Sequence, residues 1–226
     1  MKKLILAALI LGVALVGLQA QASASNLLSD PGFELGGTAI VIKDGPWTWS
    51  GGLNGDAFYD GGIQRNGAKS AKTVTWGTGS GEYAYFVENL TSFDPSTQYM
   101  FSGYLLHDTI VGTDNLASGS TGQLKVDWYD STDVATRTLL RSDVSSLFDN
   151  SYTADAWHSF SVTTANAPAG AVLASAVVVL TENSAYSGGN AFYTDDMDFS
   201  PVPEPNTMLL LGTGLIGLLG FRRIKK

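Results

Sequence analysis

The chain has 226 residues, with 13 Lys or Arg against 21 Asp or Glu, so its formal net charge is −8 at pH 7. It contains no cysteine, which excludes thiol nucleophiles, cysteine-ligated zinc and iron–sulfur clusters. The acidic balance excludes nucleic acid as a partner, because proteins that bind DNA or RNA need basic surfaces.

Residues 1–24 read as a signal peptide. Lys2-Lys3 form a charged n-region, residues 4–18 form an apolar h-region, and Ala22-Ser23-Ala24 is a small-residue cleavage site. Cleavage by signal peptidase after this site would leave Ser25 as the first residue of the mature protein. A retained anchor is the alternative, against which the cleavage site argues. The sequence therefore predicts an exported protein.

Residues 25–200 are the predicted folded domain, and they are more acidic than the whole chain. Without Lys2-Lys3 and the four basic residues of 222–226, 7 of the 13 cationic residues remain, and without Glu204, 20 of the 21 acidic ones remain. The domain therefore has a net charge of −13. A field of this sign favours divalent cations and repels nucleic acid and anionic lipid.

Short runs of β-forming residues, bounded by turn residues, predict an all-β domain. Leu124, Val126 and Trp128 alternate with polar residues, which is the period of a half-buried strand. The run Val177–Leu180 is apolar on both faces and indicates a central strand. Further strands are expected at residues 70–76, 82–88, 98–107, 157–163, 171–180 and 191–199.

Two segments between these runs are interpreted separately. Ser142–Phe148 hints at a short helix, and Gly77–Gly81 reads as a hairpin turn because it lacks the Lys-Ser/Thr of a phosphate loop. Many short strands with turns between them are typical of a β-sandwich or jelly roll.

Three segments carry a family resemblance. Asn26–Glu34 reads N-L-L-S-D-P-G-F-E, Pro46-Trp47 follows it, and Phe192–Met197 reads F-Y-T-D-D-M near the end of the domain. In this order they resemble the jelly-roll carbohydrate-binding modules, which begin with a strand reading N-L-x-x-x-G-F-E. The resemblance extends over residues 26–199, with an interruption at residues 108–149. It implies a jelly-roll-like β-sandwich that binds carbohydrate without catalysis.

The same resemblance implies a structural Ca²⁺ ion that ties the first strand to the last. The first-strand glutamate corresponds to Glu34, and the last-strand aspartate corresponds to Asp195 or Asp196. Because Ca²⁺ takes six to eight oxygen ligands, backbone oxygens near Lys69 would have to contribute. The alternative is that Glu34 caps a turn and the aspartates pair with lysine or backbone amides.

Sugar binding in this family relies on exposed aromatic rings. Asp44–Gly62 is expected to be a loop, and it contains four aromatic residues: Trp47, Trp49, Phe58 and Tyr59. Trp47 matches a position that the family packs into its core, so Trp49 and Tyr59 are the candidate ligand-binding residues. Trp76, Trp128 and Trp157 are expected in strands, as core or sheet-face residues.

No catalytic site is predicted. The chain has two histidines, His107 and His158, and neither an H-E-x-x-H pair nor a G-x-S-x-G elbow. The alternative is an extracellular glycoside-active enzyme that uses an unrecognised pair of carboxylates.

The C-terminal residues 201–226 combine three parts. Pro203-Glu204-Pro205 precedes an apolar run, Met208–Phe221, and the chain ends with Arg222-Arg223-Ile224-Lys225-Lys226. A helix of this run would measure about 21 Å, short of a bilayer core of roughly 30 Å. The cationic end favours a cytoplasmic C-terminus.

This order of parts resembles the PEP-CTERM sorting signal of bacterial envelope and exopolysaccharide-associated proteins. The resemblance implies recognition by a membrane-embedded exosortase, with Pro203, Glu204, Pro205, Arg222 and Arg223 as the sorting residues. It also implies transient anchoring in the inner membrane of a Gram-negative bacterium through the C-terminal helix. An ordinary tail anchor is the alternative. Together the two resemblances predict a non-catalytic carbohydrate-binding or structural protein of the envelope or extracellular matrix.

Overall fold

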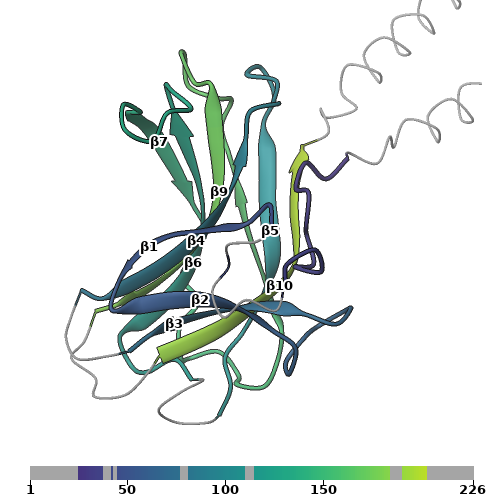
Figure 1. Ribbon diagram of the computed structural model, residues 1–226, viewed down its shortest axis with the longest axis vertical. Helices are drawn as coiled ribbons and strands as arrows, with labels where there is room; N and C mark the ends of the chain where they lie inside the picture. The colour runs from purple at the N-terminus through teal and green to yellow at the C-terminus, as the bar shows by residue number, and fades with distance from the viewer. Residues whose placement is uncertain are drawn as a thin grey trace, which may run out of the picture. The chain divides into compact units, whose positions relative to one another are not determined.

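The structure, a computed structural model, describes residues 25–37, 42, 45–76, 81–109, 115–183 and 190–202. These residues are all-β: ten strands form two antiparallel sheets, and no helix occurs in these ranges (Figure 1). A helix able to span a membrane is accordingly not found in the part of the chain that the structure describes. The predicted signal peptide and the C-terminal apolar run lie outside the described residues.

Each sheet has five strands. Sheet A has the order β1 (Thr48–Leu53), β4 (Tyr83–Leu90), β9 (Leu173–Glu182), β6 (Ser120–Tyr129) and β7 (Leu139–Val144). Sheet B has the order β2 (Gly55–Asp60), β3 (Ser70–Thr75), β10 (Asn190–Pro201), β5 (Tyr99–Leu106) and β8 (His158–Thr163). The strands expected from alternation and β-forming runs are confirmed as β3, β4, β5, β6, β8, β9 and β10.

Strand β9 has the central position that its sequence predicted. It lies between β4 and β6, and its residues are buried along nearly its whole length on both faces. A strand with two hydrogen-bonded neighbours and two covered faces favours β-branched and apolar side chains. The run Val177–Leu180 meets that requirement.

Inward-facing side chains of both sheets form one hydrophobic core. Trp128 of sheet A and Phe192 of sheet B are both completely buried, and Phe148 packs edge-on against Phe192 with ring centroids 6.1 Å apart. The prediction that Trp47 belongs to this core is confirmed. Its ring lies 5.3 Å from those of Phe33 and Phe86.

The prediction of a loop at residues 44–62 is wrong. Two strands occupy most of it, β1 in sheet A and β2 in sheet B, with Asn54 at the turn between them. The glycines that indicated a loop serve close packing instead. A Cβ on Gly52 would lie 2.7 Å from the carbonyl oxygen of Gly55, so only glycine fits there.

Two local predictions are also wrong. The hinted helix at Ser142–Phe148 begins as the end of β7 and continues to a bridge between Phe148 and Gly122, because pairing with β6 satisfies this backbone. Residues 77–80 of the predicted hairpin turn lie outside the described residues, but the strands on either side, β3 and β4, belong to different sheets, which contradicts a hairpin.

The opening segment Asn26–Glu34 is not the expected first strand. It is irregular and contacts β10 through isolated hydrogen bonds, from Leu27 N to Phe199 O at 2.8 Å and from Met197 N to Pro31 O at 2.7 Å. Phe33 adopts a left-handed conformation with φ of 59°. A turn here prevents the regular ladder that a strand requires.

Candidate functional site

A β-bulge in β10 determines where the two aspartates of the F-Y-T-D-D-M segment lie. The register with β5 shifts between Asp195 and Asp198, and Asp196 adopts a left-handed conformation with φ of 50°. The extra residue returns Met197 to the core and leaves both aspartates on the outer side of sheet B. Met197 occupies the space that a side chain on Gly103 would need.

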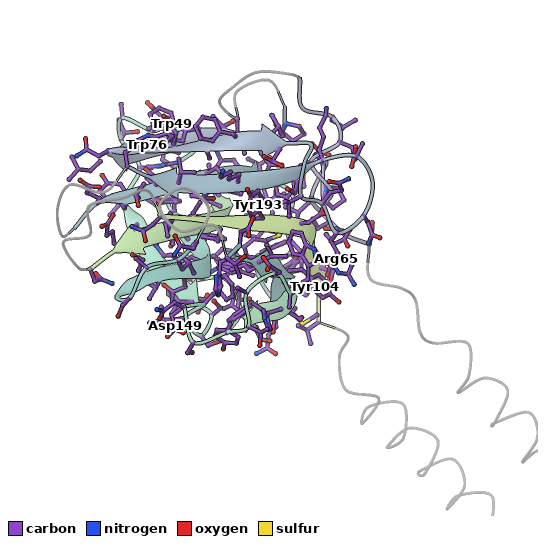
Figure 2. The ribbon with its side chains drawn as sticks, turned by 90° about the horizontal axis from the view of Figure 1, so that it is seen from below. Trp49, Arg65, Trp76, Tyr104, Asp149 and Tyr193 are labelled. Carbon is purple, nitrogen blue, oxygen red and sulfur yellow. The ribbon has the colours of Figure 1, made fainter. Side chains whose placement is uncertain are left out.

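The loop 61–69, between β2 and β3, is fastened to these aspartates. Oδ2 of Asp195 accepts hydrogen bonds from the backbone N–H groups of Arg65 at 2.7 Å and Asn66 at 3.1 Å. The side chains of Arg65 and Asn66 both donate to Oδ2 of Asp196. Figure 2 shows Arg65 beside Tyr104 of β5, with its guanidinium carbon 3.6 Å from the ring centroid.

The far end of the same loop is fastened to the opening segment. Oε1 of Glu34 accepts from the backbone N–H groups of Ala68 at 2.7 Å and Lys69 at 3.1 Å. Gly67 has a positive φ of 69°, and a Cβ there would lie 2.0 Å from that oxygen. Glu34 therefore caps this turn, and only glycine leaves room for it.

The structure thus brings Glu34, Asp195 and Asp196 together around the loop 61–69. Their carboxylates accept hydrogen bonds from N–H groups there. The oxygens that would have to face a Ca²⁺ ion face backbone amides and a guanidinium instead. No group of three acidic, histidine or cysteine side chains able to hold a metal occurs in the described ranges. This arrangement favours the capping alternative. Calcium at these residues stays a prediction.

Three buried carboxyls, Asp30, Glu88 and Asp195, have raised pKa values. Burial raises the pKa of Asp195, although backbone N–H groups partly oppose the rise. Burial likewise raises the pKa of Asp30, which accepts from Glu34 N at 2.8 Å, and of Glu88, which accepts from Ser29 N at 2.7 Å. Sequence reasoning missed Asp30. Its position before Pro-Gly is the signal that could have found it, since aspartate caps such turns.

The two candidate sugar-binding aromatics do not lie on an exposed loop. Trp49 belongs to β1, packs against the core, and has a buried indole N–H with no hydrogen-bond partner among the described residues. Tyr59 belongs to β2, and its ring fills the space left by Gly36 and Gly45. Both side chains are partly buried between the sheets, and their role in binding stays a prediction.

Other aromatic side chains are more accessible. On the outer face of sheet A, the stacked rings of Tyr83 and Tyr85 have centroids 6.1 Å apart and an interplanar angle of 26°. Tyr83 is 40% exposed. The spacing of these tyrosines along E-Y-A-Y-F is the sequence signal that could have found them, because residues two apart share a strand face. Trp76 is 54% exposed and lies beside Phe58 at the end of β3.

The remaining tryptophans and the histidines have different environments. Trp128 is in the core, as expected, whereas Trp157 is half-buried and precedes β8. Nε2 of His107 lies 3.0 Å from the carbonyl of Tyr152, and Nε2 of His158 lies 2.9 Å from that of Thr153. Each histidine thus contacts main chain. Pro203, Glu204, Pro205, Arg222 and Arg223 lie outside the described residues.

Comparisons with known proteins address the C-terminus and the fold separately. Residues 201–224 match the PEP-CTERM protein-sorting motif, which indicates an exported, envelope-associated protein. No curated protein matches the chain.

Among solved structures, the enzymatically active domain of tailspike protein 4 from bacteriophage CBA120 is similar over 78% of this chain, with a TM-score of 0.53 and 12% identity. This chain spans 21% of that protein, and the likeness shows the fold alone.

Structural neighbours also include jelly-roll carbohydrate-binding modules. TmCBM61, solved with β-1,4-galactotriose, is 16% identical to this chain, with a TM-score of 0.48. The alignment covers 79% of this chain and all of TmCBM61. The CBM22-1 xylan-binding domain of Paenibacillus barcinonensis Xyn10C is 17% identical to this chain, with a TM-score of 0.47. The alignment covers 82% of this chain and all of that domain.

Proposed function

We propose that this chain is exported, processed at its C-terminus by an exosortase-type enzyme, and delivered to the cell surface or extracellular matrix. The match of residues 201–224 to the sorting motif carries this proposal. The apolar run that follows Pro-Glu-Pro is short for a permanent anchor, which suits a segment that is removed. Signal peptidase would act at the other end, after Ala24.

The sorting step is tested by replacing the motif in cells that carry an exosortase. Pro203→Ala/Glu204→Ala/Pro205→Ala should leave an unprocessed chain in the inner membrane, seen as a larger band in membrane fractions. Arg222→Ala/Arg223→Ala should impair processing by weakening membrane orientation. Asn206→Ala is the matched control and should be processed normally. Normal processing and surface delivery of the triple variant would contradict the proposal.

We further propose that the domain has jelly-roll topology and binds polysaccharide weakly, without catalysis, on the outer face of sheet A. The stacked pair Tyr83 and Tyr85 carries this proposal. Two parallel rings separated along a strand offer apolar platforms for the faces of sugar rings. Gly51, opposite Tyr85, leaves room for the ring: a Cβ there would lie 3.2 Å from Cε1 of Tyr85.

Polar groups continue from the tyrosines across the same face. Gln123 lies in register with Val179 and so with Tyr85, and Lys125 and Asp127 follow on β6. Lys125 Nζ contacts Asp127 Oδ2 at 3.3 Å, and the amide of Gln123 donates to Ser145 O at 2.8 Å. These bonds hold the side chains in place, and ordered polar groups beside an apolar platform are the usual composition of a ligand site.

A binding assay with the full chain in detergent tests this surface. Because the neighbouring modules are a galactotriose complex and a xylan-binding domain, β-1,4-galactan and xylan are the first polysaccharides to use. Retardation in a gel that contains the polysaccharide should be lost in Tyr85→Ala and retained in Trp76→Ala, a matched exposed aromatic on the other sheet. Loss in Trp49→Phe or Tyr59→Phe alone would move the site to strands β1 and β2.

The same assay separates binding from catalysis. A binding module should retard without releasing reducing sugar, whereas a glycoside-active enzyme should release it. A protein that shows neither behaviour with a broad polysaccharide panel would be an inert matrix component, and the carbohydrate proposal would then be wrong.

A further inference from the structure

Two glutamates meet between the sheets, at the opposite end of β3 from the loop 61–69. Glu182 ends β9, and its backbone N–H donates to the carbonyl of Glu82, just before β4, at 2.8 Å. Side chains alternate along a strand, and Ala84 and Leu180 point into the core, so Glu82 and Glu182 point inward too. They are only 3% and 0% exposed.

Each glutamate of this pair accepts a hydrogen bond from a neutral donor. Nδ2 of Asn54, in the turn between β1 and β2, donates to Oε1 of Glu82 at 2.9 Å. Oγ1 of Thr75, from sheet B, donates to Oε2 of Glu182 at 3.0 Å. Glu182 forms no ion pair with any described residue. Hydrogen bonds from neutral donors lessen the cost of burying two carboxylates but do not cancel their charge.

Two oxygens beside the pair lack partners. Oε1 of Glu182 and Oγ of Ser120 are buried and accept or donate no hydrogen bond among the described residues. Ser120 lies directly opposite Glu182 in the β6–β9 ladder, and residues paired in this way have Cβ atoms about 5 Å apart on the same face. Unsatisfied oxygens of this kind are rare in native proteins and need a missing partner.

We propose that a Ca²⁺ ion binds between the two sheets at Glu82, Glu182 and Ser120. A hard divalent cation is bound by carboxylate and hydroxyl oxygens, and it would neutralise two like charges that otherwise repel each other across adjacent strands. The amide orientation of Asn190 is set by Ala117 N, which donates to its Oδ1 at 2.8 Å. Its Nδ2 is therefore a donor, able to hold a water ligand of the ion.

This site differs in place and residues from the calcium site that the family resemblance implied at Glu34, Asp195 and Asp196. It joins sheet A to sheet B, because Thr75 of β3 holds one of the glutamates. Binding there would clamp the sheets together where β3, β4, β9 and β10 begin or end. The proposal is independent of carbohydrate binding.

Equilibrium dialysis with radioactive Ca²⁺, on the full chain in detergent after EDTA treatment, tests the site directly. The native chain should bind Ca²⁺ in stoichiometric amount, and Glu182→Gln should lower the affinity of one site at least about tenfold. Ser120→Ala should weaken the same site. The matched control is Glu88→Gln, because Glu88 is a buried, inward-facing glutamate of β4; this variant should bind as the native chain does.

Thermal unfolding shows whether a variant that binds no Ca²⁺ is still folded. In EDTA, Glu182→Gln should unfold at the same or a higher temperature than the native chain, because the repulsion is removed, so loss of binding is not loss of folding. Added Ca²⁺ should raise the native midpoint and leave that of Glu182→Gln unchanged.

Absence of Ca²⁺ binding by the native chain would overturn the proposal. The two glutamates would then share a proton or bind a water molecule instead. Binding that survives in Glu182→Gln but is lost in Glu34→Gln would overturn the proposal too, and would place the ion at the first and last segments.

Discussion

The central carbon of the Arg65 guanidinium lies 3.6 Å from the ring centroid of Tyr104, and Nη1 of the same side chain pairs with Asp196. One side chain thus connects the loop 61–69 to two adjacent strands of sheet B, β5 and β10. The contact needs a delocalised planar cation, which arginine provides and lysine does not. The sequence offered no signal for it, because 39 residues separate Arg65 from Tyr104 along the chain.

Arg65→Ala should lower the free energy of unfolding by about 1 kcal/mol, since a partly exposed cation–π contact and a partly exposed ion pair each contribute a fraction of that. Arg65→Lys should recover only part of the loss. Arg137→Ala, which removes a comparable contact with Tyr129, should cost less because Arg137 forms no ion pair in the described part of the chain. Urea denaturation measures all three, and equal losses for Arg65→Ala and Arg137→Ala would contradict this account.

Asp195→Asn should release the loop without unfolding the domain. An asparagine can present one oxygen to the two backbone N–H groups of Arg65 and Asn66 but has lost the charge that strengthens those bonds. We expect faster hydrogen exchange at both amides at pH 7 without a loss of global stability, because burial disfavours the Asp195 charge and raises its pKa. Exchange at β9 should change only as far as global stability does. Unchanged exchange at Arg65 and Asn66 would show that Asp195 does not hold the loop.

Stability should rise on mild acidification. Burial raises the pKa of Asp30, Glu88 and Asp195 above the ordinary values of 3.8, 4.5 and 3.8, so the folded state holds protons that the unfolded state has released. The free energy of unfolding therefore falls as pH rises through this window. The stability from these groups is fully present below the ordinary values and is lost above the raised ones.

Thermal midpoints measured from pH 7 down to about 5 test this sign. The native midpoint should rise on acidification, and Glu88→Gln should unfold at a higher temperature at pH 7 with a flatter pH dependence. Asp94→Asn is the control of opposite sign, since hydrogen bonds from Ser96 lower the pKa of Asp94. A steeper pH dependence in Glu88→Gln than in the native chain would contradict the assignment.

Gly36→Ala should destabilise the domain through Tyr59. A Cβ at Gly36 would lie 2.1 Å from Cζ of the Tyr59 ring, so the ring must move, at a cost of about 1–3 kcal/mol. Gly32→Ala is the matched control in the same segment, because the nearest atom to its Cβ is Cγ of Glu34 at 3.7 Å. Equal stability of the two variants would show that Tyr59 is not confined by Gly36.

The strands that could be read from the sequence are those whose burial has a local cause. Leu124, Val126 and Trp128 alternate with polar residues because one face of β6 is in the core, and Val177–Leu180 is apolar throughout because β9 has sheet on both sides. Strands β1 and β2 were missed because Gly52 and Gly55 serve close contacts with β3 and β4. Glycine has the same local signature in a turn and at a close approach.

The sequence by itself determined that this chain is all-β, acidic and free of cysteine, and that its C-terminus carries a PEP-CTERM sorting motif. These properties depend on composition, on a period of two, or on a contiguous motif. Only the tertiary structure decided what the carboxylates do. The surroundings of Glu34, Asp195, Glu82 and Glu182 come from segments 28 to 130 residues away. A carboxylate is a cap, a buried acid or a cation ligand according to whether N–H groups or oxygens face it.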